Sequence, residues 1–121
     1  MGAKEIKYSV ILSENIFFVK MLRELGISSK YLGFYFLIDI LDMLINKKMV
    51  VKSFSKEVYP IIAQKYNMKE CTIERNIRNL IDKTWNQKIR YKVKGLWFNQ
   101  EKPTCCKFIH IIKNYIIMQI V

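Results

Sequence analysis

Hydrophobic residues recur every three or four positions along the first part of the chain, a spacing typical of helices that bury one face. The apolar positions that define two such helices are Phe18, Met21, Leu22 and Leu25, followed by Phe34, Leu37, Ile38, Leu41 and Ile45. Ser13 is the predicted N-cap of the first helix, and Gly26 is predicted to end it. Ser28 and Ser29 are alternative N-caps of the second helix, whose apolar stripe leaves Asp39 on the opposite face.

Two further helices are predicted to be joined by a short turn. The first of them covers Ser55 to Tyr66, and Pro60 indicates that it either begins near this proline or is kinked there. Residues 67–69 form the turn, and the next helix runs from Glu70 to about Trp85. The arrangement over about 57–85 is that of a helix-turn-helix.

The pattern changes after this motif. Apolar and basic residues alternate with a period of two, which predicts a short basic β-like arm at 88–98 that turns near Gly95. A last helix begins at Pro103 or Thr104, and its apolar tail at 117–121 is expected to pack inward or against a partner. The predicted fold class is all-α: a compact helical bundle formed by one domain, 1–121, that contains the helix-turn-helix.

The second helix of the motif has two chemically different faces. Apolar residues gather on one side, namely Ile73, Ile77, Leu80 and Ile81. Polar and charged residues gather on the other, namely Glu74, Arg75, Arg78, Asn79 and Asp82. Arginine can bind guanine through two hydrogen bonds and glutamate can accept one from cytosine, so this face suits DNA reading. An ordinary surface ion pair between Glu74 and Arg78, four residues apart, explains the pattern equally well.

Charge favours the DNA interpretation. The 121 residues contain 21 Lys and Arg against 10 Asp and Glu, a net charge of +11. Residues 1–60 hold nine basic and six acidic residues (+3), and 61–121 hold twelve and four (+8). The second helix of the motif is the candidate recognition helix. The basic residues from its end through the predicted arm are Lys83, Lys88, Arg90, Lys92 and Lys94. Such a run binds phosphates without sequence preference, although a solvated basic strand is the alternative.

The sequence lacks the residue patterns needed for metal binding, nucleotide binding or nucleophilic catalysis. His110 is the only histidine, and the four glycines form no nucleotide-binding loop. Cys71, Cys105 and Cys106 lack the spacing of a zinc site, and Cys106 with His110 lacks a third group that would make a catalytic nucleophile. We therefore expect no enzyme activity, metal or cofactor. With three cysteines, no signal peptide and no long apolar stretch, the sequence predicts a cytoplasmic protein without a membrane segment.

Four stretches of the chain resemble a known family. They are GISSKYLGFYFL (26–37), EVYPIIAQKYN (57–67), TIERNIRNLIDKTW (72–85) and KPTCCKFI (102–109). They resemble the C-terminal effector domain of the stage-zero master response regulator of sporulation in endospore-forming bacteria. The resemblance implies an all-helical transcription factor domain that binds short, often tandem operator boxes in double-stranded DNA.

The resemblance also assigns roles to residues. Glu74, Arg75 and Arg78 match base-reading positions of the family, and Lys102 and Thr104 match a motif near the DNA backbone. Further DNA-binding candidates on or beside the recognition helix are Lys69, Thr72 and Asn79, and those in the basic arm are Lys88, Arg90, Lys92 and Lys94.

The sequence departs from the family at several of these places. Thr72 replaces a DNA-contacting arginine and Lys69 a capping threonine, while Lys30 and Leu32 replace a histidine and a lysine. Residues 86–101 are shorter and more basic than the family's segment, which contacts the sigma factor of RNA polymerase. The family's receiver domain does not fit within 121 residues, so we expect a standalone relative.

Two functions follow as hypotheses. The first is a sequence-specific transcriptional regulator that binds DNA, forms a dimer on tandem sites and contacts RNA polymerase or a homologous regulator. The second is a protein-interaction module or antagonist that keeps the fold but binds a partner protein through its apolar tail.

Overall fold

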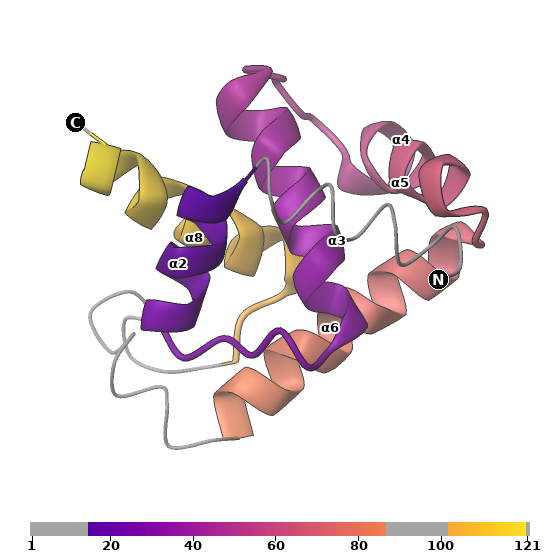
Figure 1. The fold of residues 1–121 in the computed structure, drawn as a ribbon. Coiled ribbons are helices and arrows are strands. Elements are labelled where there is room, and N and C mark those ends of the chain that lie inside the picture. The colour runs from indigo at the N-terminus through magenta and orange to yellow at the C-terminus, as the bar shows by residue number, and fades with distance from the viewer. Residues whose placement is uncertain (1–14, 87–101, 121) are drawn as a thin grey trace.

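The structure, a computed structural model, describes residues 15–86 and 102–120, and within these ranges it contains helices and no strand (Figure 1). The all-α prediction is therefore confirmed, while the predicted arm at 88–98 lies outside the described residues. The elements are α2 (Ile16–Glu24), α3 (Leu32–Leu41), η1 (Asp42–Asn46), α4 (Phe54–Glu57), α5 (Tyr59–Tyr66), α6 (Glu70–Asn86) and α8 (Cys105–Ile120).

Helix α3 is the centre of the bundle, and α2, α6 and α8 pack around it (Figure 1). It is buried on nearly all sides, which explains why its sequence is apolar beyond the predicted stripe: Phe36 and Ile40 are as fully buried as Phe34. Asp39 lies off that stripe as predicted, yet it is buried as well. Its carboxylate accepts hydrogen bonds from the Lys65 ammonium at 2.8 Å and from the Tyr66 hydroxyl, so it joins α3 to α5.

The ends of α2 and α3 test the predicted caps except Ser13, which lies outside the described residues. Gly26 has a φ of 86°, and its N–H and that of Ile27 bond the last carbonyls of α2, so the predicted end is confirmed. The N-cap predictions for α3 are wrong, because the helix begins at Leu32 after an extended Tyr31. Ser28 instead accepts a hydrogen bond from the Lys30 N–H within the connecting turn.

The predicted helix over residues 55–66 is divided in two. Val58 separates α4 from α5, and Pro60 lies in the first turn of α5, where its missing N–H breaks no helical bond. Of the two alternatives for Pro60, the helix start is thus confirmed. Ser53 caps α4 by accepting from the Lys56 N–H, and Glu57 accepts from the Ser53 N–H at 2.6 Å.

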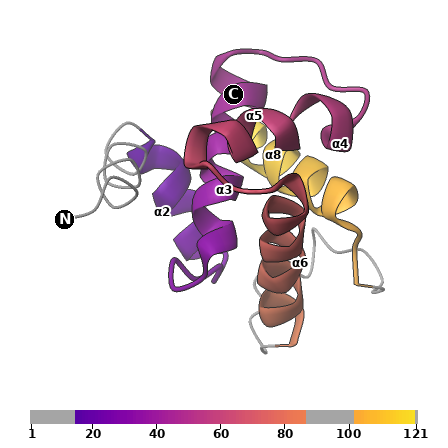
Figure 2. The same cartoon turned by 90° about the vertical axis from the view of Figure 1, so that its right-hand side faces the viewer.

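Helices α5 and α6 form the helix-turn-helix, with α4 and α5 at the N-terminal end of α6 (Figure 2). The turn is tight because Asn67 adopts a left-handed conformation with a φ of 54°, and the Met68 N–H bonds the Ala63 carbonyl at 2.9 Å. Ala63 itself is buried. Helix α6 packs against α3, α5 and α8, so three elements fix its orientation.

Candidate nucleic-acid interface

One side of α6 anchors the helix in the core. The predicted apolar residues all lie there: Ile73, Ile77 and Leu80 have no exposed surface, and Ile81 is 2% exposed. Full burial of an apolar side chain of this size stabilises the folded protein by about 1.5–3 kcal/mol. The opposite side of α6 is consequently held toward solvent in a fixed orientation.

The outer face of α6 carries the predicted base-reading residues. Arg75, Arg78 and Asn79 are exposed, and Glu74 is half-buried. Arg78 donates a hydrogen bond to the Glu74 carboxylate, so the ion pair that the sequence offered as an alternative is present. Because both side chains keep substantial exposure, water competes with this pair and its net stabilisation is small.

Two more candidates lie at the start of α6: Lys69 just before it and Thr72 in its first turn. Lys69 precedes the helix, and its carbonyl accepts hydrogen bonds from the Thr72 N–H at 3.0 Å and the Ile73 N–H at 3.4 Å, while its side chain is exposed. Thr72 is half-buried, and its carbonyl accepts from the Asn76 side-chain amide at 2.8 Å. The Lys69 side chain carries only donors, so it cannot replace a capping hydroxyl at this helix end.

The start of α8 lies beside the middle of α6. Thr104 accepts a hydrogen bond from the Lys107 N–H at 3.2 Å and so acts as the N-cap of α8, as expected for a helix that begins there. Lys102 donates to the Asp82 carboxylate of α6 at 2.6 Å, and Pro103, which follows Lys102 in the chain, is buried. Lys102 and Thr104 therefore line the same groove as Arg78, although about 25 residues separate them from it in sequence.

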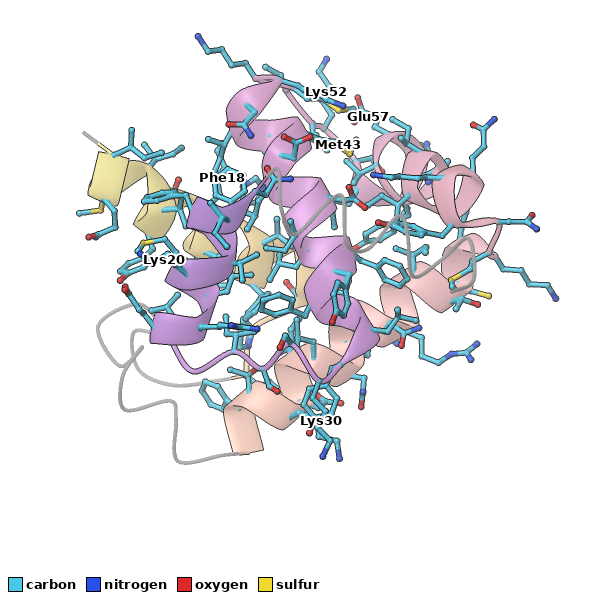
Figure 3. All side chains as sticks on the ribbon, in the orientation of Figure 1. Phe18, Lys20, Lys30, Met43, Lys52 and Glu57 are labelled. Carbon is cyan, nitrogen blue, oxygen red and sulfur yellow. The ribbon has the colours of Figure 1, made fainter. Side chains whose placement is uncertain are left out.

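A groove of about 520 Å³ separates α4, α6 and the start of α8. Its lining includes Glu74 and Arg78 of the predicted site, but also residues that the sequence analysis did not select: Lys52, Ser55, Cys105 and Cys106. Lys52, just before α4, and Glu57, the last residue of α4, lie close together (Figure 3). The basic character of the segment before α4 was visible in the sequence, but no periodicity indicated that it would lie across from α6.

Burial raises the pKa of two groups that line this groove. It raises the pKa of the Tyr59 hydroxyl well above its ordinary value, and the nearby Cys105 and Glu74 add to the shift. Burial also raises the pKa of the Cys105 thiol, although the Arg78 guanidinium opposes this shift through its charge and a hydrogen bond. Both groups are thus held in their neutral form.

The remaining predicted residues, Lys88, Arg90, Lys92 and Lys94, lie outside the described part of the chain. Within residues 15–86 and 102–120, no three His, Cys, Asp or Glu side chains come together as a metal site would require. No helix in the same ranges is long and apolar enough to span a membrane.

Comparison with known families agrees with this geometry. The model of the family described as "Sporulation initiation factor Spo0A C terminal" matches residues 18–116, a range that contains both the helix-turn-helix and the start of α8. The match covers most of the 121 residues. The chain belongs to this family of C-terminal effector domains, which are DNA-binding domains of the sporulation response regulator.

Proposed function

We propose that the protein is a sequence-specific transcriptional regulator that places α6 in the major groove of double-stranded DNA. Glu74, Arg75 and Arg78 read base edges in this proposal. The observation that carries it is the exposed, charged outer face of α6 opposite a fully buried apolar side. Because this helix is already fixed in the folded protein, its backbone needs no further ordering before the arginines bind DNA.

When Arg78 binds a base, its guanidinium must either leave the Glu74 carboxylate or bond Glu74 and the base at the same time. Breaking an exposed pair costs about 0–1 kcal/mol. A two-bond contact of arginine with guanine contributes about 1–3 kcal/mol of discrimination, which exceeds that cost. In the free protein, Arg78 is held by Glu74 and also bonds the Cys105 side chain at the start of α8.

Phosphate contacts from flanking residues would hold this helix in place. Lys102 and Thr104 line the same groove as Arg78 at the positive end of α8, a helix end that favours anions. Additional contacts are proposed for Lys69, Thr72 and Asn79 around α6, and for the basic residues Lys88, Arg90, Lys92 and Lys94. These contacts increase affinity for any sequence and make binding weaker at high salt.

The proposal extends to the setting in which the protein acts. We place it in the cytoplasm, as one helix-turn-helix domain over 1–121 without enzymatic activity or cofactor. It would bind tandem operator sites as a dimer and contact RNA polymerase or a homologous regulator.

A second candidate function is that of a protein-interaction module. The end of α8 favours it, because Met118 is 73% and Ile120 is 57% exposed, while Ile117 is only half-buried. The apolar tail thus packs inward only in part. A partner protein that covers it would remove apolar area from water without any role for α6.

An NMR titration of the ¹⁵N-labelled protein with an operator duplex distinguishes the two functions. If DNA binds through α6, the amide signals of residues 69–79 and 102–107 should shift at lower DNA concentrations than those of residues 115–120. Shift changes confined to α2 and the end of α8 would contradict the proposed orientation. No shift change with DNA, together with saturable changes at 115–120 on addition of a homologous regulator, would favour the interaction module.

A further inference from the structure

The groove between α4, α6 and the start of α8 borders the face of α6 that is proposed to read DNA, because Glu74 and Arg78 belong to both. Figure 2 shows α4 and the start of α8 beside α6. Lys102 and Thr104 line the groove from the start of α8, and the exposed Lys52 lines it from the segment just before α4. A DNA strand held at Lys102 and Thr104 would therefore run along the same groove as Lys52.

Lys52 differs from the other cations of the groove in its charge environment. Arg78 pairs with Glu74, and Lys102 pairs with Asp82. Lys52 forms no ion pair with any carboxylate in the part of the chain that the structure describes. Three cationic and two acidic side chains of the described residues line the groove, so Lys52 leaves it with a net charge of +1.

The main chain at Lys52 is held in place by Glu57. One carboxylate oxygen of Glu57 accepts hydrogen bonds from the Lys52 N–H at 2.7 Å and from the Ser53 N–H at 2.6 Å. Glu57 thus lies close to Lys52 but bonds its main chain and leaves the ammonium group unpaired (Figure 3). The Lys52 side chain extends from a fixed backbone, which lowers the entropy lost when the ammonium group binds an anion.

A buried hydroxyl is a second, independent observation that points to a ligand in this groove. Tyr59, the first residue of α5, is only 4% exposed and lines the groove. The groups whose charges act on its hydroxyl, Cys105, Glu74, Cys106 and Arg78, all line the groove as well, so the hydroxyl points toward it.

The Tyr59 hydroxyl makes no hydrogen bond to any residue within 15–86 and 102–120. A buried polar group that lacks a partner is unfavourable, so an acceptor that enters the groove gains a hydrogen bond that the free protein does not make. Burial keeps this hydroxyl protonated, and it can therefore donate to an anionic oxygen.

We propose that this groove binds one phosphate of the DNA backbone, with the Lys52 ammonium group as its cation and the Tyr59 hydroxyl as a hydrogen-bond donor. This inference rests on the proposed function and adds two residues to it. The positive end of α8 lies at the same groove, and Thr104 caps only one of its free N–H groups, that of Lys107. A phosphodiester oxygen suits this combination, since it is anionic and accepts several hydrogen bonds.

Such a contact would position α6 without reading sequence. Because Arg78 lines the same groove, a strand anchored at Lys52 and Tyr59 would fix the distance between Arg78 and the base edges. The contact would strengthen binding to the operator and to any other duplex by the same factor.

The test compares two variants of the full chain with matched controls. Lys52→Ala removes the charge and Tyr59→Phe removes the donor. Lys56→Ala is the first control, because Lys56 is exposed on α4 and does not line the groove. Tyr115→Phe, in α8, is the second control, and Lys52→Arg keeps the charge in place. Anisotropy measures the affinity for an operator duplex and a scrambled duplex from about 0.05 to 0.2 M salt.

Lys52→Ala should weaken binding to both duplexes by about five- to tenfold at about 0.1 M salt and leave their ratio unchanged. It should also reduce the slope of log affinity against log salt by about 0.9, the value for one phosphate. Lys56→Ala should change the slope less, and Lys52→Arg should behave as wild type. Tyr59→Phe should weaken binding to both duplexes by about tenfold without a change in slope, because it removes a hydrogen bond and no charge.

Operators with a single methylphosphonate, which replaces one charged phosphate by a neutral group, locate the contact. At the phosphate bound in the groove, this change should weaken the wild type much more than Lys52→Ala or Tyr59→Phe, because the variants have already lost the interaction.

Three results would overturn the proposal: losses that add at every phosphate position, equal salt slopes for Lys52→Ala and Lys56→Ala, or a Tyr59→Phe protein that binds like Tyr115→Phe. Failure of the proposed function shows separately, since the wild type would then bind DNA without preferring the operator. A wild type that binds no duplex would overturn both.

Discussion

Gly33 of α3 lies directly against the backbone of Asn76 in α6. A Cβ atom placed on Gly33 would lie 2.3 Å from the Asn76 carbonyl oxygen and 3.1 Å from the Leu80 Cβ. Only glycine permits this approach, so the position of the recognition helix depends on a residue of the central helix. Backbone atoms, unlike a flexible side chain, cannot move aside locally.

Gly33→Ala is therefore expected to force α3 and α6 apart. Overpacking of this kind costs about 1–3 kcal/mol. The gain in helix propensity, about 1 kcal/mol at most, does not offset it. Urea unfolding should show a lower free energy of unfolding than wild type. Gln64→Ala, at an exposed position of α5, is the control and should change stability little; a Gly33→Ala protein as stable as that control would contradict the close approach.

Asp39 is expected to matter more than an ordinary surface aspartate. Asp39→Ala removes an acceptor that both Lys65 and the buried Tyr66 hydroxyl use, and such a loss costs about 1–3 kcal/mol. Asp39→Asn keeps one acceptor oxygen and should lose less. Asp42→Ala is the matched control. The half-buried Asp42 pairs at 3.8 Å with a largely exposed Lys47 and accepts a hydrogen bond from the exposed Asn46 amide at 2.8 Å, so we expect its loss to cost less, below about 1 kcal/mol. Equal losses for Asp39→Ala and Asp42→Ala in urea unfolding would refute the role of the buried carboxylate.

Tyr59 should make the fold sensitive to alkali. Burial raises the pKa of Tyr59, so the unfolded chain releases this proton at lower pH than the folded protein. The stability linked to Tyr59 is present below about pH 10, the ordinary tyrosine value, and is lost as pH rises through the folded-state pKa. Tyr59→Phe should therefore show a shallower loss of unfolding free energy between about pH 10 and 12 than wild type. Tyr115→Phe, which changes a half-buried tyrosine of α8, is the control and should follow wild type; superimposable curves for all three would contradict the prediction.

Arg75 and Arg78 should determine sequence preference. Replacing either with alanine is expected to cost about 1–3 kcal/mol of operator binding and to relax preference at one base pair, because a base contact is lost. Lys20→Ala on α2, an exposed position remote from α6 (Figure 3), removes the same charge and should change affinity little. Anisotropy titrations with operators altered at single positions measure both effects. An Arg75→Ala protein that retains the full operator preference would show that Arg75 does not read a base.

Several elements of this fold could be predicted because their signals are local. The turn at residues 67–69, the proline at the start of α5 and the two faces of α6 all depend on a few neighbouring residues. The start of α3 could not be predicted in this way, since burial of Gly33 and Phe34 sets it instead of a serine cap. Asp39 was placed on the correct face, but its burial depends on Lys65 and Tyr66, 26 and 27 residues away.

The candidate site was predictable to a similar extent. Helical periodicity places Glu74, Arg75 and Arg78 on one face without knowledge of the fold. The groove beside them is formed by α4 and α8, which are distant in sequence, so Lys52, Cys105 and Cys106 carried no signal that linked them to Arg78. Tertiary packing alone brings these residues together.

The most direct test of the central claim is fluorescence anisotropy with a duplex that carries the family's operator box and a scrambled duplex of equal length, across a salt series. A sequence reader is expected to bind the operator more tightly than the scrambled duplex by about 10³-fold or more at near-physiological salt. Both affinities should fall with salt, but their ratio should persist, because base contacts release few counterions. Equal affinities that fall steeply together would contradict base reading by α6 and leave only a basic surface.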